Sequence, residues 1–496
     1  MSVHNLSAVL ALALVGSAAC TPGVSESNGD AVRLTHIEGL GSLSFPNSGA
    51  EDAQEAFHRG VLLLHSFEYE PSAEAFRRAQ ELDPEFALAY WGEAMTYNHP
   101  FWRQKDVAAA HEALGRYAAT AQERLAKAPS ERERMYFEAI EMLYGDGDKA
   151  AQDHAYMKGM QRLSEAYPED HEARAFHALS ILGSMDGSRD FTTYVRAAAT
   201  VQPVFDANPN HPGAVHYLIH SFDDPVHAPL GLPAARLFSD IAPRASHAQH
   251  MTTHIFVAMG MWDDVVSGNA RASEVQDGQL ADQGEPANVC GHYSSWLHYG
   301  RLMRGEVTEA EAMMDRCYQR MSEEPTAGER SYFASMRARQ IFDTEDWSLA
   351  DRWLAAPEGD SGPLARADFV DGFTNALAAL EKGDAVPARQ FLAGAGEPDN
   401  DTDRVYMAEL GGLLALHDGR SDEGIEMLRA AAVLEDSMPF AFGPPAIVKP
   451  TFELLGEALL GLDRTDDAYE AFTRATERTP GRTLAVRGLQ ASAPGG

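Results

Sequence analysis

The chain has 496 residues, enough to bury several hydrophobic cores, and its acidic residues outnumber its basic residues 74 to 40. The formal net charge of −34 repels nucleic acid and anionic lipid surfaces, which excludes both as expected partners, and it attracts metal ions and basic proteins. In many proteins such a charge serves solubility alone. Beyond the N-terminus, no apolar run is long enough to predict a transmembrane helix.

Residues 1–20 form a predicted signal segment. The apolar run from Leu6 to Val15 is too short to cross a bilayer, and small residues follow it up to Cys20. Small residues directly before a cysteine resemble a bacterial lipoprotein signal, in which Cys20 is lipidated and becomes the first mature residue. Ordinary cleavage after a small residue is the alternative, because no Lys or Arg precedes the apolar run. Both processes export the chain. We therefore expect a bacterial protein of the periplasm, or a lipoprotein anchored in the outer membrane through Cys20 alone.

Residues 21–50 are rich in Ser, Gly, Asn and Pro and predict a flexible tether. One short ordered stretch is expected within it, around Leu43 to Phe45.

A period of 34 residues runs through the rest of the chain and predicts tetratricopeptide repeats, each a pair of antiparallel helices. The last unit shows the small, aromatic and proline positions of the repeat most clearly, at Phe452, Gly456, Leu459, Ala468, Phe472, Ala475 and Pro480. The first unit repeats them at Gly60, Ser72, Phe76, Ala79 and Pro84. Small residues let the two helices approach each other, and the aromatic ring fills the space between them.

The fold class predicted from this period is all-α: a tetratricopeptide-repeat superhelix, or α-solenoid, of about nine or ten helix–turn–helix units. We divide it into N-terminal units at residues 51–270, which carry a histidine cluster, and C-terminal units at residues 271–496. Longer loops are expected near residues 184–190 and 275–285.

Two pairs of histidines occupy the same two positions in consecutive units. His216 and His220 are followed 34 residues later by His250 and His254, so each pair has the spacing i, i+4 on one helix face. In the register of the repeat these positions belong to the first helix and face the inner, concave side. First helices of adjacent units stack about 10 Å apart, so the four imidazoles are predicted to converge in the groove on a transition metal. Recent duplication could also copy histidines, but the residues between them differ.

Two neighbouring residues extend this predicted site. His247 lies three residues before His250 on the same face and is predicted as a further ligand. Asp223 and Asp224 lie just past the helix of His220 and could supply a carboxylate ligand or orient an imidazole, and Asp224 is the one predicted at the site. His65 and His99, again 34 residues apart, are expected to line the groove. These ligands fit either one closed site or two adjacent metal ions.

The ligand type limits the choice of metal. Imidazole with an optional carboxylate suits zinc or copper, and also iron, rather than calcium or magnesium. Met251, Met259 and Met261 would favour copper(I) as ligands, although methionines at this helical spacing are more often core residues. An open coordination position would allow the metal to activate water or bind oxygen, whereas the known nucleotide-binding and serine-hydrolase motifs are absent from the sequence.

Two further features lie in the C-terminal half. Cys290 precedes the first helix of a unit and Cys317 lies late in its second helix, so antiparallel packing brings them together and an oxidising compartment would allow a disulfide. Two buried free thiols are the alternative. The segment from Phe442 to Pro445 predicts a rigid extended connection to the last unit, with Lys449 near a carboxylate.

The chain resembles a family of mostly uncharacterised bacterial tetratricopeptide-repeat proteins that are exported or lipoprotein-like. The blocks that carry the resemblance are residues 62–102, 211–265, 442–460 and 479–489. The middle block, HPGAVHYLIHSFDDPVHAPLGLPAARLFSDIAPRASHAQHMTTHIFVAMGMWDDV, is the most specific. The resemblance implies a repeat fold and a shared histidine motif, which here comprises His99, His216, His220, His247, His250 and His254. It implies no reaction.

Two functions are consistent with these features. The first is an exported protein that binds a transition metal through groove-facing histidines, for storage, delivery or catalysis. The alternative is a metal-free scaffold whose acidic concave groove holds a peptide, a protein or a small molecule. The sequence leaves open whether the protein is an enzyme.

Overall fold

The computed structural model describes residues 34–185, 189–353, 365–398 and 400–494. The signal segment, Cys20 and the first part of the tether lie outside these residues. Among the described residues, no helix combines the length and apolar character needed to cross a membrane.

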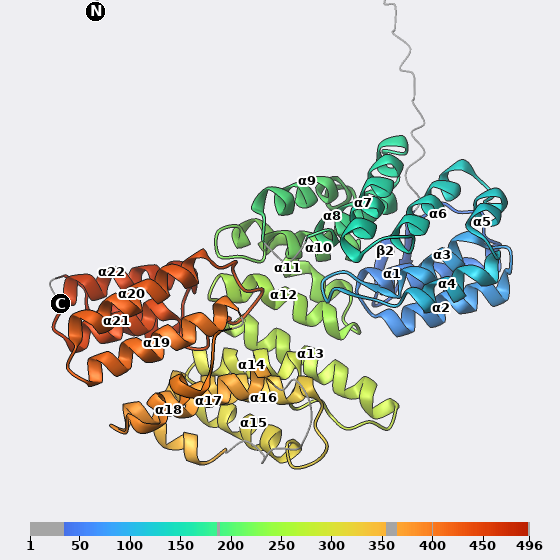
Figure 1. The fold of residues 1–496 in the computed structure, drawn as a ribbon. Helices are drawn as coiled ribbons and strands as arrows, with labels where there is room; N and C mark the ends of the chain where they lie inside the picture. The colour runs from blue at the N-terminus through green and yellow to red at the C-terminus, as the bar shows by residue number, and fades with distance from the viewer. Residues whose placement is uncertain (1–33, 186–188, 354–364, 399, 495–496) are drawn as a thin grey trace, which may run out of the picture. The chain divides into compact units, whose positions relative to one another are not determined.

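The described chain is almost entirely helical and is a tetratricopeptide-repeat superhelix, as predicted (Figure 1). The N-terminal helices are α1 Gln54–His65, α2 Tyr69–Leu82, α3 Ala87–Met95, α4 Val107–Tyr117, α5 Ala121–Lys127, α6 Glu131–Leu143, α7 Lys149–Ala166, α8 His171–Gly183 and α9 Phe191–Ala207. The central helices are α10 Pro212–Phe222, α11 Ala228–Ile241, α12 Ser246–Ala258, α13 Trp262–Asp282, α14 His292–Met303, α15 Val307–Arg320 and α16 Ala327–Thr344. The C-terminal helices are α17 Ala365–Glu381, α18 Val386–Gly394, α19 Asp401–His417, α20 Ser421–Ser437, α21 Thr451–Gly461, α22 Thr465–Arg478 and α23 Thr483–Ala491.

Each repeat is a pair of consecutive helices that pack on each other. The pairs are α1 with α2, α3 with α4, α6 with α7, α8 with α9, α10 with α11, α12 with α13, α14 with α15, α17 with α18, α19 with α20 and α21 with α22. The predicted small residues explain the close packing. A Cβ atom on Gly60 would lie 2.8 Å from the ring of Phe76, and one on Gly456 would lie 2.7 Å from Phe472. The number of pairs agrees with the predicted nine or ten units.

Short non-helical elements complete the described fold. They are two antiparallel hairpins, β1 Thr35–Ile37 with β2 Gly41–Leu43 and β3 Asn98–His99 with β4 Gln104–Lys105, and the 3₁₀ turns η1 Glu51–Ala53 and η2 Trp347–Asp351.

Residues 34–50 differ from the predicted tether because they are fastened to the helices. Leu43 and Phe45 are buried, and the Phe45 ring contacts Phe57, Trp91 and Tyr136. The Ser42 hydroxyl also donates to the Asn208 side chain at 3.1 Å. The burial of these two large apolar side chains stabilises the ordered conformation of the segment.

Two other predicted boundaries are wrong. The division at residues 270 and 271 and the loop near residues 275–285 both fall largely within α13, which continues to Asp282. The buried residues of α13 lie between Val265 and Ala272, and the helix continues to Asp282 past the last of them.

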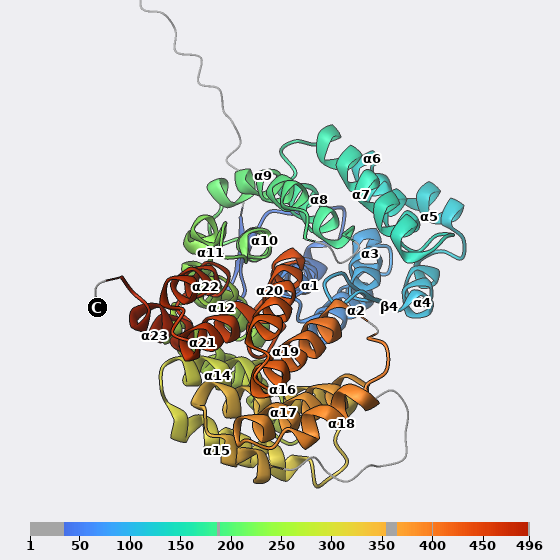
Figure 2. The same cartoon turned by 60° about the vertical axis from the view of Figure 1, so that its left-hand side comes forward.

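The C-terminal repeats pack back onto the central ones (Figure 2). Trp262 of α13 donates its indole N–H to the Gly481 carbonyl at 2.8 Å, and the Thr483 hydroxyl donates to the Met303 carbonyl at 2.9 Å. The connection before α21 presses on α14, since a Cβ atom on Gly443 would lie 2.0 Å from the Trp296 indole.

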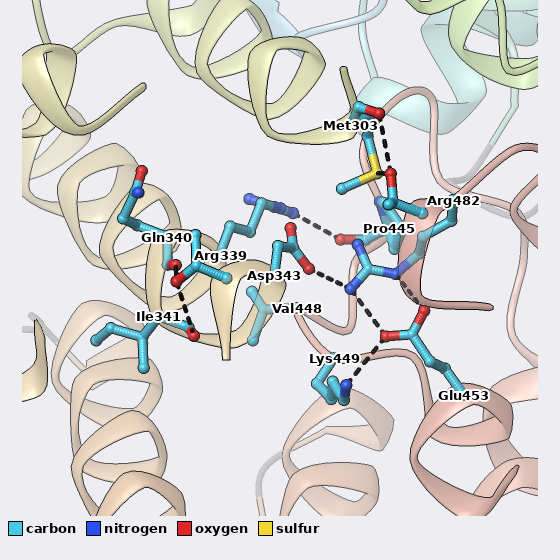
Figure 3. A network of polar contacts seen from close by, with 12 residues as sticks. Met303, Arg339, Gln340, Ile341, Asp343, Pro445, Val448, Lys449, Glu453 and Arg482 are labelled. Carbon is cyan, nitrogen blue, oxygen red and sulfur yellow. Dashed lines mark hydrogen bonds and ion pairs between the residues drawn. The ribbon is translucent and has the colours of Figure 1, made fainter. Parts of the chain in front are cut away.

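Buried charges hold the end of this connection (Figure 3). Arg482 pairs with Asp343 and with Glu453, whose Oε2 is 2.8 Å from Arg482 Nε. The Lys449 ammonium lies 3.2 Å from Glu453 and 2.6 Å from Glu457. The predicted contact between Lys449 and a carboxylate is therefore present, and it is part of a network that spans α16, α21 and the residue before α23.

Candidate metal centre

The two matched histidine pairs lie on α10 and α12, which are the first helices of adjacent repeats and contact each other. Pro212 at the first position of α10 and the side chain of His211, which accepts from the Ala214 N–H, start that helix. From this start, His216 and His220 point to the same side as His250 and His254 of α12. The sequence register therefore placed the four imidazoles on neighbouring helix faces.

These imidazoles are buried and do not line an open groove. The side chains of His216, His220, His247, His250 and His254 are between 0 % and 7 % exposed. Aromatic rings cover them: Phe67 lies 4.3 Å from His216 and Phe101 3.7 Å from His220, measured between ring centroids. Trp296 lies 4.6 Å from both His250 and His254. The prediction of groove-facing histidines missed this cover, because Phe67, Phe101 and Trp296 come from loops and from other repeats.

The histidines divide into two groups of three rather than one group of four. His216 and His220 form one group with His247, and His250 and His254 form the other with His292. Within each group, one ligand atom from every residue lies within 4.8 Å of the others. Sequence reasoning missed His292 because it is the first residue of α14, outside the matched positions. The feature that could have revealed His292 is its place at the start of the first helix of the next repeat. The longer connection before Cys290 shifts this helix out of the 34-residue register.

Asp223, and not Asp224, contacts the cluster. The Nδ1–H of His254 donates to Asp223 Oδ2 at 3.0 Å, and the same oxygen lies 3.7 Å from His220 Nδ1. Asp224 instead accepts from the backbone N–H and the ring of His227, which closes the turn after α10. The prediction for Asp224 is wrong because α10 ends between His220 and these residues. Past a helix end, the periodic direction of side chains no longer applies.

Arg189 neutralises Asp223 with an ion pair between two buried side chains. Burial alone would raise the pKa of Asp223, but Arg189 and the two histidines hold it below its ordinary value. Asp223 therefore stays an anion that orients His254.

Hydrogen bonds fix which ring nitrogen carries the proton in three of the histidines. His216 Nδ1 donates to the backbone carbonyl of His65 at 2.7 Å, and His250 Nδ1 lies 2.7 Å from the side-chain oxygen of Asn269. The Asn269 amide nitrogen donates to the Val265 carbonyl, so its oxygen faces the imidazole. His254 donates Nδ1–H to Asp223. All three residues therefore keep an unprotonated Nε2, which is the metal-binding form of imidazole.

The free nitrogens are buried without hydrogen-bond partners among the described residues. They are His216 Nε2, His247 Nε2 and both ring nitrogens of His220. His250 Nε2 and His254 Nε2 face each other at 3.1 Å. Burial lowers the pKa of His220 to about 4 and that of His292 to about 3. It also lowers the pKa of His216, His247 and His250 well below the ordinary value. The imidazoles are therefore neutral, and their lone pairs face one another.

His65 belongs to a separate, fully paired network behind the cluster. It donates Nε2–H to Glu172 at 2.7 Å and accepts from the Tyr217 hydroxyl at 2.8 Å, while His211 donates to the other Glu172 oxygen at 2.9 Å. Burial alone would raise the pKa of Glu172, but His211 and His65 keep it below the ordinary range. Because the carbonyl of His65 accepts from His216, this network positions His216 and is not groove lining.

His99, the other predicted groove residue, lies at the edge of the cluster. Its ring stacks on Tyr69 with centroids 3.9 Å apart, and its Nε2 donates to the Thr96 carbonyl at 3.0 Å. His99 lines a cavity of about 290 Å³ together with Trp102 and His247. A second cavity of about 50 Å³ touches Asp223 and His254 on the other side. Each histidine group therefore borders a cavity.

A disulfide joins Cys290 to Cys317. It ties the residue two positions before His292 to the end of α15 and so fastens the start of α14, which carries this ligand.

In comparisons with known proteins, no protein-family model and no curated protein sequence match the chain. Solved structures that resemble it include the human IFIT1 dimer with m7Gppp-AAAA, at 13 % identity over 91 % of this chain and 92 % of the other, with a TM-score of 0.35. The Cut9–Hcn1 hetero-tetramer of APC/C has 12 % identity over 91 % and 78 %, with a TM-score of 0.33. The P58(IPK) TPR domain has 10 % identity over 89 % and 97 %, with a TM-score of 0.21. These likenesses concern the fold alone.

Proposed function

We propose that this chain is an exported tetratricopeptide-repeat protein that binds a transition metal through its buried histidine cluster. The observation that carries the proposal is the contact of His250 Nε2 with His254 Nε2 at 3.1 Å. Nδ1 of each residue faces an oxygen acceptor, so in the neutral form of both rings this contact brings two lone pairs together. Two imidazole ligands at about 2.0–2.1 Å from a tetrahedral ion lie about 3.3 Å apart, which matches this spacing.

The remaining geometry supports the same function. Neutral imidazoles suit zinc, copper or iron. The partners of the Nδ1 atoms are a carboxylate, an amide oxygen and a backbone carbonyl, which are the groups that usually orient metal-binding histidines. Met251 packs in the hydrophobic core, with Met259 and Met261 against it, so these methionines support no thioether ligand.

Two observations support export. The disulfide between Cys290 and Cys317 is typical of an oxidising compartment, and the sequence resembles exported bacterial repeat proteins with a lipoprotein-type cysteine at Cys20. We therefore place the protein in the periplasm or on a membrane to which only a lipid on Cys20 attaches it.

The test is the metal content of protein purified without a histidine tag. We expect zinc, copper or iron to copurify and His250→Ala to lower the bound amount, while His417→Ala, which changes a partly exposed histidine on α19, leaves it unchanged. Protein that holds no metal after purification and after incubation with each of the three ions would refute the proposal.

The alternative function is a metal-free scaffold, and a pull-down experiment distinguishes it from the metal-binding protein. A metal-free scaffold would bind the same protein partners in the native chain and in the His216→Ala and His250→Ala variants. If partners are retained by both variants and no metal is bound by the native chain, the scaffold is the better description.

A further inference from the structure

The two histidine groups have the same construction, one repeat apart. In the first group, the pair His216 and His220 on α10 is joined by His247, the second residue of α12. In the second group, the pair His250 and His254 on α12 is joined by His292, the first residue of α14. Each group therefore combines an i, i+4 pair from one first helix with a histidine from the start of the next. From this repetition we infer that the cluster holds two metal ions side by side, each bound by three histidines. The inference rests on the proposed metal binding and deepens it.

The distances within each group fit one ion per group. In the first group, the His216 ring centroid lies 4.9 Å from that of His220 and 5.1 Å from that of His247. In the second, the His250 centroid lies 5.0 Å from His254 and 4.4 Å from His292. The two groups adjoin each other, with ring centroids 5.7 Å apart from His220 to His254 and 6.2 Å apart from His247 to His250. His220 and His254 also lie together with Asp223, with ligand atoms within 4.8 Å of one another.

A shared carboxylate links the two sites. Asp223 Oδ2 accepts from His254 of the second group and lies 3.7 Å from His220 of the first. One side chain therefore orients His254 and lies beside His220, so the two ions would be neighbours in one buried site.

The charge of the surroundings selects the kind of ion. Imidazoles bind metal as neutral ligands, and the carboxylate that accepts from His254 is already paired with Arg189. A second carboxylate, that of Glu68, accepts from the His247 backbone N–H at 3.4 Å, and burial raises its pKa above the ordinary value. Two divalent ions would add four positive charges to a buried site, and the cost of burying an ion rises with the square of its charge. Two univalent ions add half the charge at about a quarter of the cost for each ion. Among transition metals that bind imidazole, this condition points to copper(I).

The deciding measurement is the copper(I) stoichiometry of the full chain. Under anaerobic conditions, the metal-free protein competes with a chromophoric copper(I) chelator while increasing amounts of copper(I) are added. We expect about two equivalents per chain to bind more tightly than the chelator. An equimolar amount of zinc should not displace them.

Single substitutions assign the two sites. His216→Ala and His292→Ala should each leave about one equivalent, because each removes a ligand from a different group, and His417→Ala should leave two. Unfolding curves of the metal-free variants check that each is folded, and His292→Gln serves as a second variant should His292→Ala not fold.

Each result has a separate consequence. One equivalent in the native chain, lost in both His216→Ala and His292→Ala, would overturn the two-ion inference and leave the proposed metal binding in place. Displacement of copper by equimolar zinc would overturn the assignment to copper(I). Binding of no metal of any kind would overturn the proposed function itself.

Discussion

Two buried polar clusters of this protein follow opposite principles. Around Arg482, two cations pair with three carboxylates, so their charges are compensated by the chain itself (Figure 3). The cations are Arg482 and Lys449, and the carboxylates are those of Asp343, Glu453 and Glu457. Arg339 beside them donates to the Pro445 carbonyl. In the histidine cluster, the ring nitrogens on the inner side face each other without partners among the described residues. Hydrogen bonds at Nδ1 hold the rings of His216, His250 and His254 in place, and the Nε2 atoms of these rings face the interior of the cluster.

The difference separates a structural network from a binding site. A buried polar group without a partner costs about 1–3 kcal/mol, and the histidine cluster collects several of them in one place. The Arg482 network balances its charges within the chain and joins the C-terminal repeats to α16. Under the proposed function, a ligand that accepts lone pairs completes the histidine cluster.

Breaking the Arg482 network should give the largest effect. Arg482→Met leaves Asp343 buried without its cation and Glu453 with Lys449 alone, and we expect a loss of about 3–5 kcal/mol in the free energy of unfolding. Chemical denaturation measures it. Arg487→Met is the matched control, because Arg487 is 58 % exposed in its pair with Glu345 and should cost no more than about 1 kcal/mol. Equal losses in the two variants would contradict the structural role of the network.

Removing the metal should have the next largest effect. At a free metal concentration 100 times the Kd, binding raises the free energy of unfolding by about 2.7 kcal/mol. Thermal unfolding with and without a chelator should show this gain in the native chain and in His417→Ala. In His250→Ala the gain should shrink or disappear. A histidine cluster that served structure alone would give the same unfolding curve in both conditions.

Changing a residue that orients a ligand should have a smaller effect. Asn269→Leu removes the acceptor of His250 Nδ1–H, and we expect metal affinity to fall about 10- to 100-fold. Thr253→Val removes another contact of Asn269 and should leave the affinity nearly unchanged. Competition with a chelator measures both. An unaltered Kd in Asn269→Leu would show that the orientation of His250 does not matter for binding.

The smallest effect is expected at Glu409, a buried acid beside the ion-pair network. Its Oε1 accepts from the Thr451 hydroxyl, and burial raises its pKa well above the ordinary value. Above the ordinary glutamate pKa, the unfolded chain therefore releases a proton that the folded chain keeps, and stability falls as the pH rises. Glu409→Gln should stabilise the protein by about 1 kcal/mol at pH 7 and have little effect near pH 4. Denaturation at the two pH values tests this, and a loss of stability at pH 7 would contradict it.

Much of the fold could be predicted from local patterns. The 34-residue period places Gly60 against Phe76 and Gly456 against Phe472, because each unit packs chiefly on its neighbours. The sequence predicted an ordered stretch at Leu43 to Phe45, but the ordering of the rest of residues 34–50 and the length of α13 could not be predicted in this way. The first depends on a pocket for Phe45 built by α1, α3 and α6, and the second continues past the residues that the repeat requires.

For the site, the sequence by itself determined that His216, His220, His250 and His254 share one side of two adjacent helices, since i, i+4 spacing and the repeat period are local properties of the chain. Only the tertiary structure decided which three imidazoles meet, that Asp223 rather than Asp224 joins them, and that aromatic rings seal them from solvent. The physical reason is that these outcomes depend on helix ends and on side chains from distant repeats. There the direction of a side chain follows from packing and not from the periodicity of one helix.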